Sequence, residues 1–210
     1  MYTYRIEQAL RAATILHKDQ VRKGSIPMPY VSHLFAVAMI AIDYTQEEDV
    51  LIAALLHDTL EDTDYTPSEL EADFGGKVRE IVESLTEPQD SEKKTYTWKE
   101  TKARYAKQLR KAPQEALLIA AADKIHNMRA MVEEYYDEHS RFMKEFSGSL
   151  EDRLIQYQDI SNVLNKNLKS DILNEFNHVF TEYKNFISDV KKTKDQSNVN
   201  SVVLHISQNP

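Results

Sequence analysis

The stretch that decides the fold is VLIAALLHDTLED, residues 50–62, in which seven consecutive apolar residues lead into a histidine and an aspartate. An apolar run of this kind predicts a helix that is buried on most sides. We predict one helix from Glu47 to about Asp62. A carboxylate such as Asp58 at the end of that run is costly to bury unless a cation accompanies it.

The next turn of the same helix adds two more acids. Glu61 follows His57 by four residues and Asp62 follows Asp58 by four, so the four groups would share one helical face. Three carboxylates side by side repel one another unless a cation is present. An acidic, solvated helix end is the plainer alternative, and the apolar run upstream argues against it.

Two other predicted helices also bring a polar group to an apolar surface. His33 opens a helix that we expect to begin at Ser32, as N-cap, and to run to about Tyr44. Asp123 follows six small or apolar residues in a predicted helix over 114–136. Taken alone, His33 could be a hydrogen-bonded core histidine and Asp123 an interhelical salt-bridge partner. If the three helices pack together, two imidazoles and two carboxylates converge, and a divalent metal is their simplest shared partner.

The rest of the chain also favours helices, with only 4 glycines and 6 prolines in 210 residues. We predict an all-α fold, a bundle of about eight to ten helices, with loops over 22–30 and 87–96. Thr66, Pro67 and Glu69 form a helix start with a capping box. The remaining expected helices are 4–20, the segment after Thr66 up to Phe74, 77–85, 97–111, 149–165 and 168–190. We expect one domain over 1–192, with core motifs in 22–130 and C-terminal helices at about 149–190. The remaining residues, 193–210, are expected to form a loose tail in which 202–206 could add a short strand.

Composition narrows the function classes. The net charge of −8 argues against a general nucleic-acid binder but leaves room for a small anionic substrate. No apolar stretch approaches the roughly 18 residues of a membrane span, and the N-terminus lacks the pattern of a signal peptide. Cysteine is absent, which rules out thiolate metal sites and fits a cytoplasmic location.

Four segments together resemble a known family: RKG at 22–24, PYVSH at 29–33, AALLHDTLEDT at 53–63 and ADKIHNMR at 122–129. They follow the H…HD…D pattern of HD-domain phosphohydrolases. More specifically, they are similar to the hydrolase domain of the RelA/SpoT alarmone enzymes, above all to the stand-alone small alarmone hydrolases. The resemblance covers roughly residues 3–165.

The resemblance implies a Mn²⁺-dependent enzyme that removes the 3′-pyrophosphate of (p)ppGpp, giving GDP or GTP and pyrophosphate. It implies roles for eleven residues: metal ligation by His33, His57, Asp58 and Asp123; orientation of water and proton transfer by Glu61 and Asp62; and substrate binding by Arg22, Lys23, Tyr30, Lys124 and Asn127. It names a small phosphorylated nucleotide as the partner and gives no protein partner. His17 and His126 lie beside motif residues, and the sequence favours structural roles for both.

Two alternatives stay open. An HD enzyme could act on another nucleotide, such as NADPH, on which some small members of the resembled family act, a 5′-nucleotide or a dNTP. A 5′-nucleotidase or dNTP hydrolase would share the metal set but would not need the loop at 22–24 or the pair of Glu61 and Asp62 in this arrangement. A catalytically silent module could keep the fold and bind a nucleotide without turning it over. Retention of three costly carboxylates argues against such a module.

Overall fold

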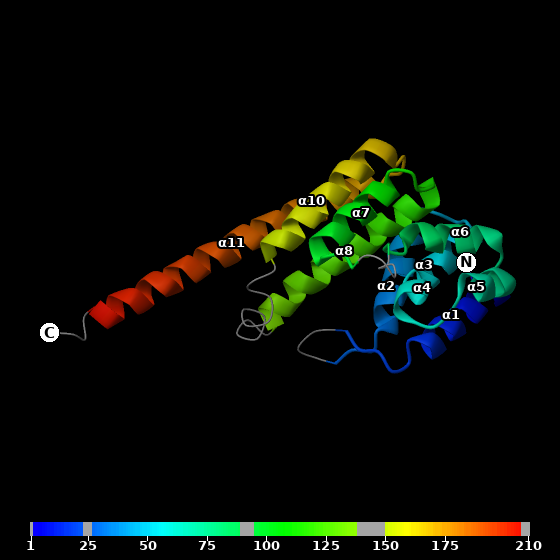
Figure 1. Ribbon diagram of the computed structural model, residues 1–210, viewed down its shortest axis with the longest axis horizontal. Helices are drawn as coiled ribbons and strands as arrows, with labels where there is room; N and C mark the ends of the chain where they lie inside the picture. The colour runs from blue at the N-terminus through cyan, green and yellow to red at the C-terminus, as the bar shows by residue number, and fades with distance from the viewer. Residues whose placement is uncertain (1, 23–26, 89–94, 138–149, 207–210) are drawn as a thin grey trace.

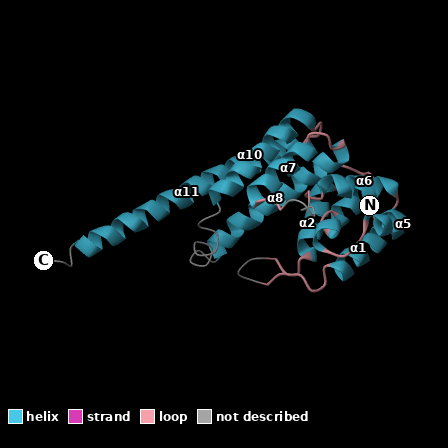
Figure 2. Ribbon diagram, in the orientation of Figure 1, coloured by secondary structure: helices cyan, strands magenta, loops and turns pink. Residues whose placement is uncertain are grey.

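The computed structural model describes residues 2–22, 27–88, 95–137 and 150–206, and within these ranges the regular structure is helical (Figure 2). In chain order the helices are α1 (Tyr4–Leu16), α2 (Val31–Ala41), α3 (Glu48–Leu56), α4 (Thr59–Asp62), α5 (Pro67–Phe74), α6 (Gly76–Leu85), α7 (Trp98–Leu109), α8 (Gln114–Asp137), α10 (Leu150–Asn167) and α11 (Ile172–Ile206). The predicted all-α class is therefore confirmed. In the same ranges, no helix is long and apolar enough to cross a membrane.

Helix α8 holds the bundle together. It packs against α2, α3, α6, α10 and α11 and lies between the N-terminal helices and the C-terminal helices (Figure 1). Buried residues of all these helices belong to one hydrophobic core. Its segment 116–122 is buried, as is every residue from Val50 to Leu56 of α3. These are the two apolar runs that the sequence singled out. Both helices pack against α2 in one hydrophobic core, which brings the residues at the ends of the runs close together.

The predicted helix over 47–62 is interrupted, and this is a correction. Helix α3 ends at Leu56 and α4 begins at Thr59. Asp58 has φ −98° and ψ −1°, in the bridge region between helix and strand conformations. The Thr59 hydroxyl donates to the Leu56 carbonyl oxygen at 2.6 Å, which satisfies a carbonyl at the end of α3. Despite the break, His57 and Asp58 line the same cavity as Glu61 and Asp62.

Helix ends were predicted with mixed success. Thr66 caps α5 through the expected capping box with Glu69. Gly75, at φ 94°, turns the chain from α5 into α6, a conformation that favours glycine. Ser32 is not the N-cap of α2. Tyr30 occupies that position, and the Ser32 hydroxyl donates back to the Pro29 carbonyl oxygen at 2.7 Å.

The first helix begins at residue 4 as predicted, but the first and last helices both end at other residues than the prediction gave. Helix α1 stops at Leu16, four residues early. Helix α11 continues to Ile206, through the segment for which the sequence predicts a loose tail and a possible short strand. Its last turns extend beyond the other helices (Figure 1).

Candidate metal and substrate site

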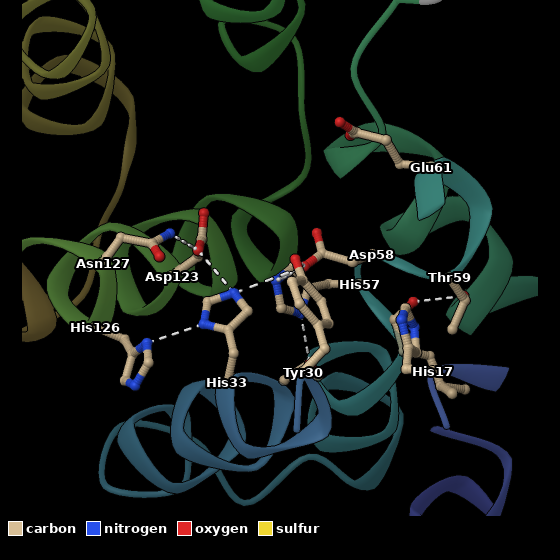
Figure 3. A network of polar contacts seen from close by, with 12 residues as sticks. His17, Tyr30, His33, His57, Asp58, Thr59, Glu61, Asp123, His126 and Asn127 are labelled. Atoms are coloured by element: carbon tan, nitrogen blue, oxygen red, sulfur yellow. Dashed lines mark hydrogen bonds and ion pairs between the residues drawn. The ribbon is translucent and has the colours of Figure 1, made fainter. Parts of the chain in front are cut away.

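One cavity of about 170 Å³ collects most of the residues that the sequence singled out. Of the eleven predicted site residues, those lining it are Tyr30, His33, His57, Asp58, Glu61, Asp62, Asp123, Lys124 and Asn127. Helix α2 with its N-cap residue, the α3–α4 turn, helix α4 and helix α8 supply them, and Figure 3 shows most of these side chains. Arg22 contacts this group from outside the cavity lining, and Lys23 lies outside the described residues. Leu85, Glu87, Tyr105 and Ala120 complete the wall.

His57 carries an unsatisfied nitrogen into this cavity. Its Nδ1 lies 2.8 Å from the Ala54 carbonyl oxygen, which can only accept, so Nδ1 carries the proton. In the neutral ring, Nε2 then presents a lone pair. That atom is buried without a hydrogen-bond partner and lies 3.2 Å from Asp58 Oδ2. A lone pair facing a carboxylate is repulsive unless a cation sits between them, and this geometry fits a metal ligand set.

His33 faces the same point from α2. Its Nε2 lies 3.6 Å from Asp58 Oδ2 and 3.3 Å from Asp123 Oδ1. One potential ligand atom from each of His33, His57 and Asp58 falls within 4.8 Å of the others, so these three could hold a metal ion. Burial lowers the pKa of His33, against the nearby carboxylates, which favours the neutral ring that a metal requires.

Asp123 stands at the edge of that group and is tied to its own helix. The Lys124 ammonium lies 2.5 Å from its Oδ2, and the Asn127 amide donates to its Oδ1. Burial would raise the pKa of Asp123, but the Lys124 charge and the contact with His33 outweigh it and hold the pKa well below the usual range. Lys124 is itself buried over the Tyr105 ring, and Asp123 holds its pKa well above the ordinary value against burial. The predicted substrate contact Lys124 is thus engaged with a carboxylate.

Tyr30 supports Asp58 from the other side. Its hydroxyl donates to Asp58 Oδ2 at 2.6 Å, and its ring stacks on His17. Burial and the neighbouring Asp58 charge raise the pKa of the Tyr30 phenol, so the hydroxyl stays a donor. His17 Nδ1 lies 2.7 Å from Gln20 Oε1, and the structural role that the sequence favours for this histidine stays a prediction.

Glu61 stands apart from the imidazoles on the far wall (Figure 3). Its side chain is exposed to solvent at the cavity, yet the cavity wall places protein atoms around the carboxyl group. This burial raises its pKa to about 7, although the hydrogen bond that its Oε2 accepts from the Glu87 amide at 3.1 Å acts in the opposite direction. Burial, followed by the Asp58 charge, also raises the pKa of Asp62. The pair predicted for proton transfer therefore binds protons more readily than ordinary carboxylates do.

A polar chain connects the loop after α1 to the cluster. Arg22 Nη2 donates to Asn127 Oδ1 at 3.1 Å, while the Asn127 amide nitrogen donates to Asp123. These two contacts fix the orientation of the amide and bring a guanidinium to the site. Sequence spacing alone could not reveal this contact, because Arg22 and Asn127 are 105 residues apart.

Two residues with functional contacts were not predicted. His126 lies with its Nδ1 2.9 Å from His33 Nδ1, where the sequence favoured a structural role. The signal was available, because His126 follows Asp123 by three residues and shares its helical face. Glu87 lines the cavity and forms an ion pair with Lys102. It lies in a polar segment with no periodicity, so no sequence pattern marks it.

Comparisons with known proteins identify the family to which this chain belongs. A family model for the HD domain matches residues 9–148, well over half of the chain, and the chain belongs to the HD-domain family. The guanosine-3′,5′-bis(diphosphate) 3′-pyrophosphohydrolase MESH1 of Mus musculus is 34% identical over 147 residues, covering 63% of this chain and 79% of the mouse protein. The bifunctional (p)ppGpp synthase/hydrolase SpoT of Escherichia coli K12 is also 34% identical, over 67% of this chain and 20% of SpoT.

Solved structures show the same relationship. A metazoan orthologue of SpoT, described as hydrolysing ppGpp, matches with a TM-score of 0.70 and 25% identity, covering 87% of this chain and 97% of the other. The Listeria monocytogenes protein lmo0812 matches with a TM-score of 0.59 and 29% identity, over 72% of this chain and 93% of the other. The fold, the His/Asp cluster and these relatives together identify an HD-domain phosphohydrolase. Within that class it is similar to the stand-alone MESH1 hydrolases and to the hydrolase domain of SpoT.

Proposed function

We propose that this protein hydrolyses the 3′-pyrophosphate of (p)ppGpp, releasing pyrophosphate and leaving GDP or GTP. The observation that carries the proposal is the convergence of nine predicted site residues on one cavity, with Arg22 tied to it through Asn127. The similarity to MESH1, whose name states this reaction, supports the choice of substrate. The Arg22 loop favours this nucleotide over those of other HD enzymes, in which no such loop is required.

We assign one divalent cation, Mn²⁺, to His33 Nε2, His57 Nε2, Asp58 and Asp123. The buried lone pair of His57 supports this assignment, because it has no other partner. When bound, such a cation polarises a phosphoryl oxygen and lowers the pKa of a nearby water. Tyr30 holds Asp58 in place through its hydroxyl, and Asn127 does the same for Asp123.

The proton transfers fall to Glu61 and Asp62. A pKa of about 7 suits Glu61 to accept the proton of the attacking water near neutral pH. The water oxygen attacks the phosphorus that is attached to the 3′ oxygen. The bond between this phosphorus and the 3′ oxygen breaks, and the departing 3′ oxygen takes up a proton. Asp62, whose pKa is also raised, is placed on the same wall and can supply it.

The volume of the cavity limits how much of the nucleotide it can enclose. Pockets that enclose a whole small ligand measure about 300–1,000 Å³, whereas this one measures about 170 Å³. We therefore assign the cavity to the 3′-pyrophosphate, with the base and the 5′ phosphates outside it, toward Arg22. Lys23, the next residue in the chain, is proposed to join that contact. The Lys124 ammonium is paired with Asp123, so we assign Lys124 the role of holding that carboxylate rather than a direct contact with the phosphates.

The test is product analysis with Mn²⁺ and, separately, ppGpp, pppGpp, NADPH, GTP and dGTP. Asp58→Ala should lose both metal and turnover. Glu61→Gln should keep the metal and lose rate, while Glu80→Gln, on the exposed side of α6, should behave like wild type. Pyrophosphate release from ppGpp by wild type supports the proposal. Turnover confined to NADPH or a 5′-nucleotide would reassign the substrate, and binding without turnover would favour the silent module.

A further inference from the structure

The two buried histidines of the cluster are oriented by different kinds of partner. His57 Nδ1 faces the Ala54 carbonyl oxygen, which only accepts. His33 Nδ1 instead lies 2.9 Å from Nδ1 of His126, and the ring centroids are 4.9 Å apart. An imidazole nitrogen can donate or accept, so the tautomer of His33 depends on which ring carries the proton between them.

Only one proton fits between those two nitrogens. If His126 donates it, the proton of neutral His33 is on Nε2, which points toward Asp123 Oδ1 at 3.3 Å. If His33 donates it, Nε2 presents a lone pair to the point that His57 and Asp58 also face. The first arrangement satisfies the carboxylate in the absence of a cation, and the second is required for metal ligation.

The fold places His126 where it can determine which nitrogen of His33 carries the proton. It lies on α8, one turn after Asp123, and its ring is half-buried beside the fully buried His33 (Figure 3). The same helix thus supplies a carboxylate on one side of His33 and an imidazole on the other. A residue that served packing alone would not need a nitrogen at hydrogen-bond distance from the second nitrogen of His33.

We infer that His126 is a positioning residue for His33: its Nδ1 accepts the His33 Nδ1 proton and leaves His33 Nε2 free for the cation. The inference rests on the metal site of the proposed function and adds a residue to it. Both rings remain neutral in both arrangements, so metal binding changes the tautomer of each ring, from Nε2–H to Nδ1–H on His33 and from Nδ1–H to Nε2–H on His126, without changing the number of protons bound.

The test uses the full chain and two substitutions of His126 by amide side chains, which place their polar atoms at different positions. The amide of His126→Asn overlies the position of Nδ1, whereas that of His126→Gln reaches the position of Nε2. Calorimetric titration with Mn²⁺ should give wild-type affinity within about threefold for Asn. It should give a loss of about 10- to 100-fold for Gln and for His126→Phe, the usual cost of losing such a partner. His178→Asn, at an exposed histidine on α11, is the matched control.

A spectroscopic readout checks the mechanism directly. With Zn²⁺ as a diamagnetic probe, ¹⁵N–¹H correlation spectra of wild type should show the His33 proton on Nδ1, and without metal on Nε2. Equal affinities for the Asn and Gln variants, or an unchanged His33 tautomer, would overturn the inference. A wild-type protein that binds no metal would also overturn it. If metal binding follows the expected pattern but ppGpp is not hydrolysed, only the proposed substrate fails.

Discussion

Replacing Lys124 by methionine removes the charge beside Asp123 and keeps most of the apolar stem over Tyr105. The two charged groups lie 2.5 Å apart, and each side chain is only 11% exposed. Removing one partner of a buried ion pair costs about 3–5 kcal/mol, because the other charge is left uncompensated. We therefore expect the metal-free protein to lose stability, measured by urea unfolding in EDTA.

The cost of leaving Asp123 charged without Lys124 has an upper limit. The carboxyl group can take up a proton, and the unpaired charge then disappears. Protonation at pH 7 of a group whose ordinary pKa is 3.8 costs about 4 kcal/mol, at 1.36 kcal/mol per pH unit. At pH 5 the same limit falls to about 1.6 kcal/mol. The expected loss is thus about 3–4 kcal/mol at pH 7 and less than about 2 kcal/mol at pH 5.

The metal-loaded protein provides the second half of the test. If the cation compensates Asp123, saturating Mn²⁺ should reduce the loss at pH 7 to about 1 kcal/mol or less. Lys99→Met, which breaks the exposed pair with Asp152, should cost less than about 1 kcal/mol in every condition. A Lys124→Met loss that is the same at pH 5 and pH 7, and unaffected by Mn²⁺, would mean that packing rather than charge is responsible, and would refute the reasoning.

Three further outcomes are expected. The kcat/KM for ppGpp should rise with pH around a midpoint near 7, because Glu61 accepts a proton only when ionised and burial raises its pKa to about 7; this rise should vanish from the residual activity of Glu61→Gln. Thr66→Ala removes the α5 cap and should cost about 1 kcal/mol, seen as a melting temperature about 2–4 °C lower with unchanged Mn²⁺ affinity. Gly75→Ala forces a Cβ onto a backbone at φ 94° and should cost about 1–3 kcal/mol although no atom crowds the site; equal stability in a thermal melt would contradict that account.

The sequence predicted the helices that carry extended apolar runs. The runs before His57 and Asp123 are both buried in one hydrophobic core, and that packing is what an apolar face requires. The convergence of His33, His57, Asp58 and Asp123 follows from it, since each lies at an end of an apolar surface. The roles assigned to these residues remain predictions.

What the sequence could not predict depends on contacts between distant segments or on short local bonds. The break after Leu56 is stabilised by the Thr59 hydroxyl, and a threonine in a helical pattern is too common to signal a break. The Arg22 contact with Asn127 and the pairing of His126 with His33 require the packed structure. The extension of α11 to Ile206 contradicts local composition, because polar residues dominate the segment after Val190.

The separation of the proposed ligands along the chain has a consequence for synthesis. His33 emerges early, the His57–Asp58 turn follows, and Asp123 comes 90 residues after His33. Helix α8 carries that last carboxylate and also covers α2, α3 and α6. A nascent chain that has emerged only as far as α6 therefore offers an incomplete coordination set on helices whose apolar faces are still uncovered. Closure of the bundle and completion of the proposed metal site are then the same event, so tight cation binding at that site would report that the chain has folded through α8.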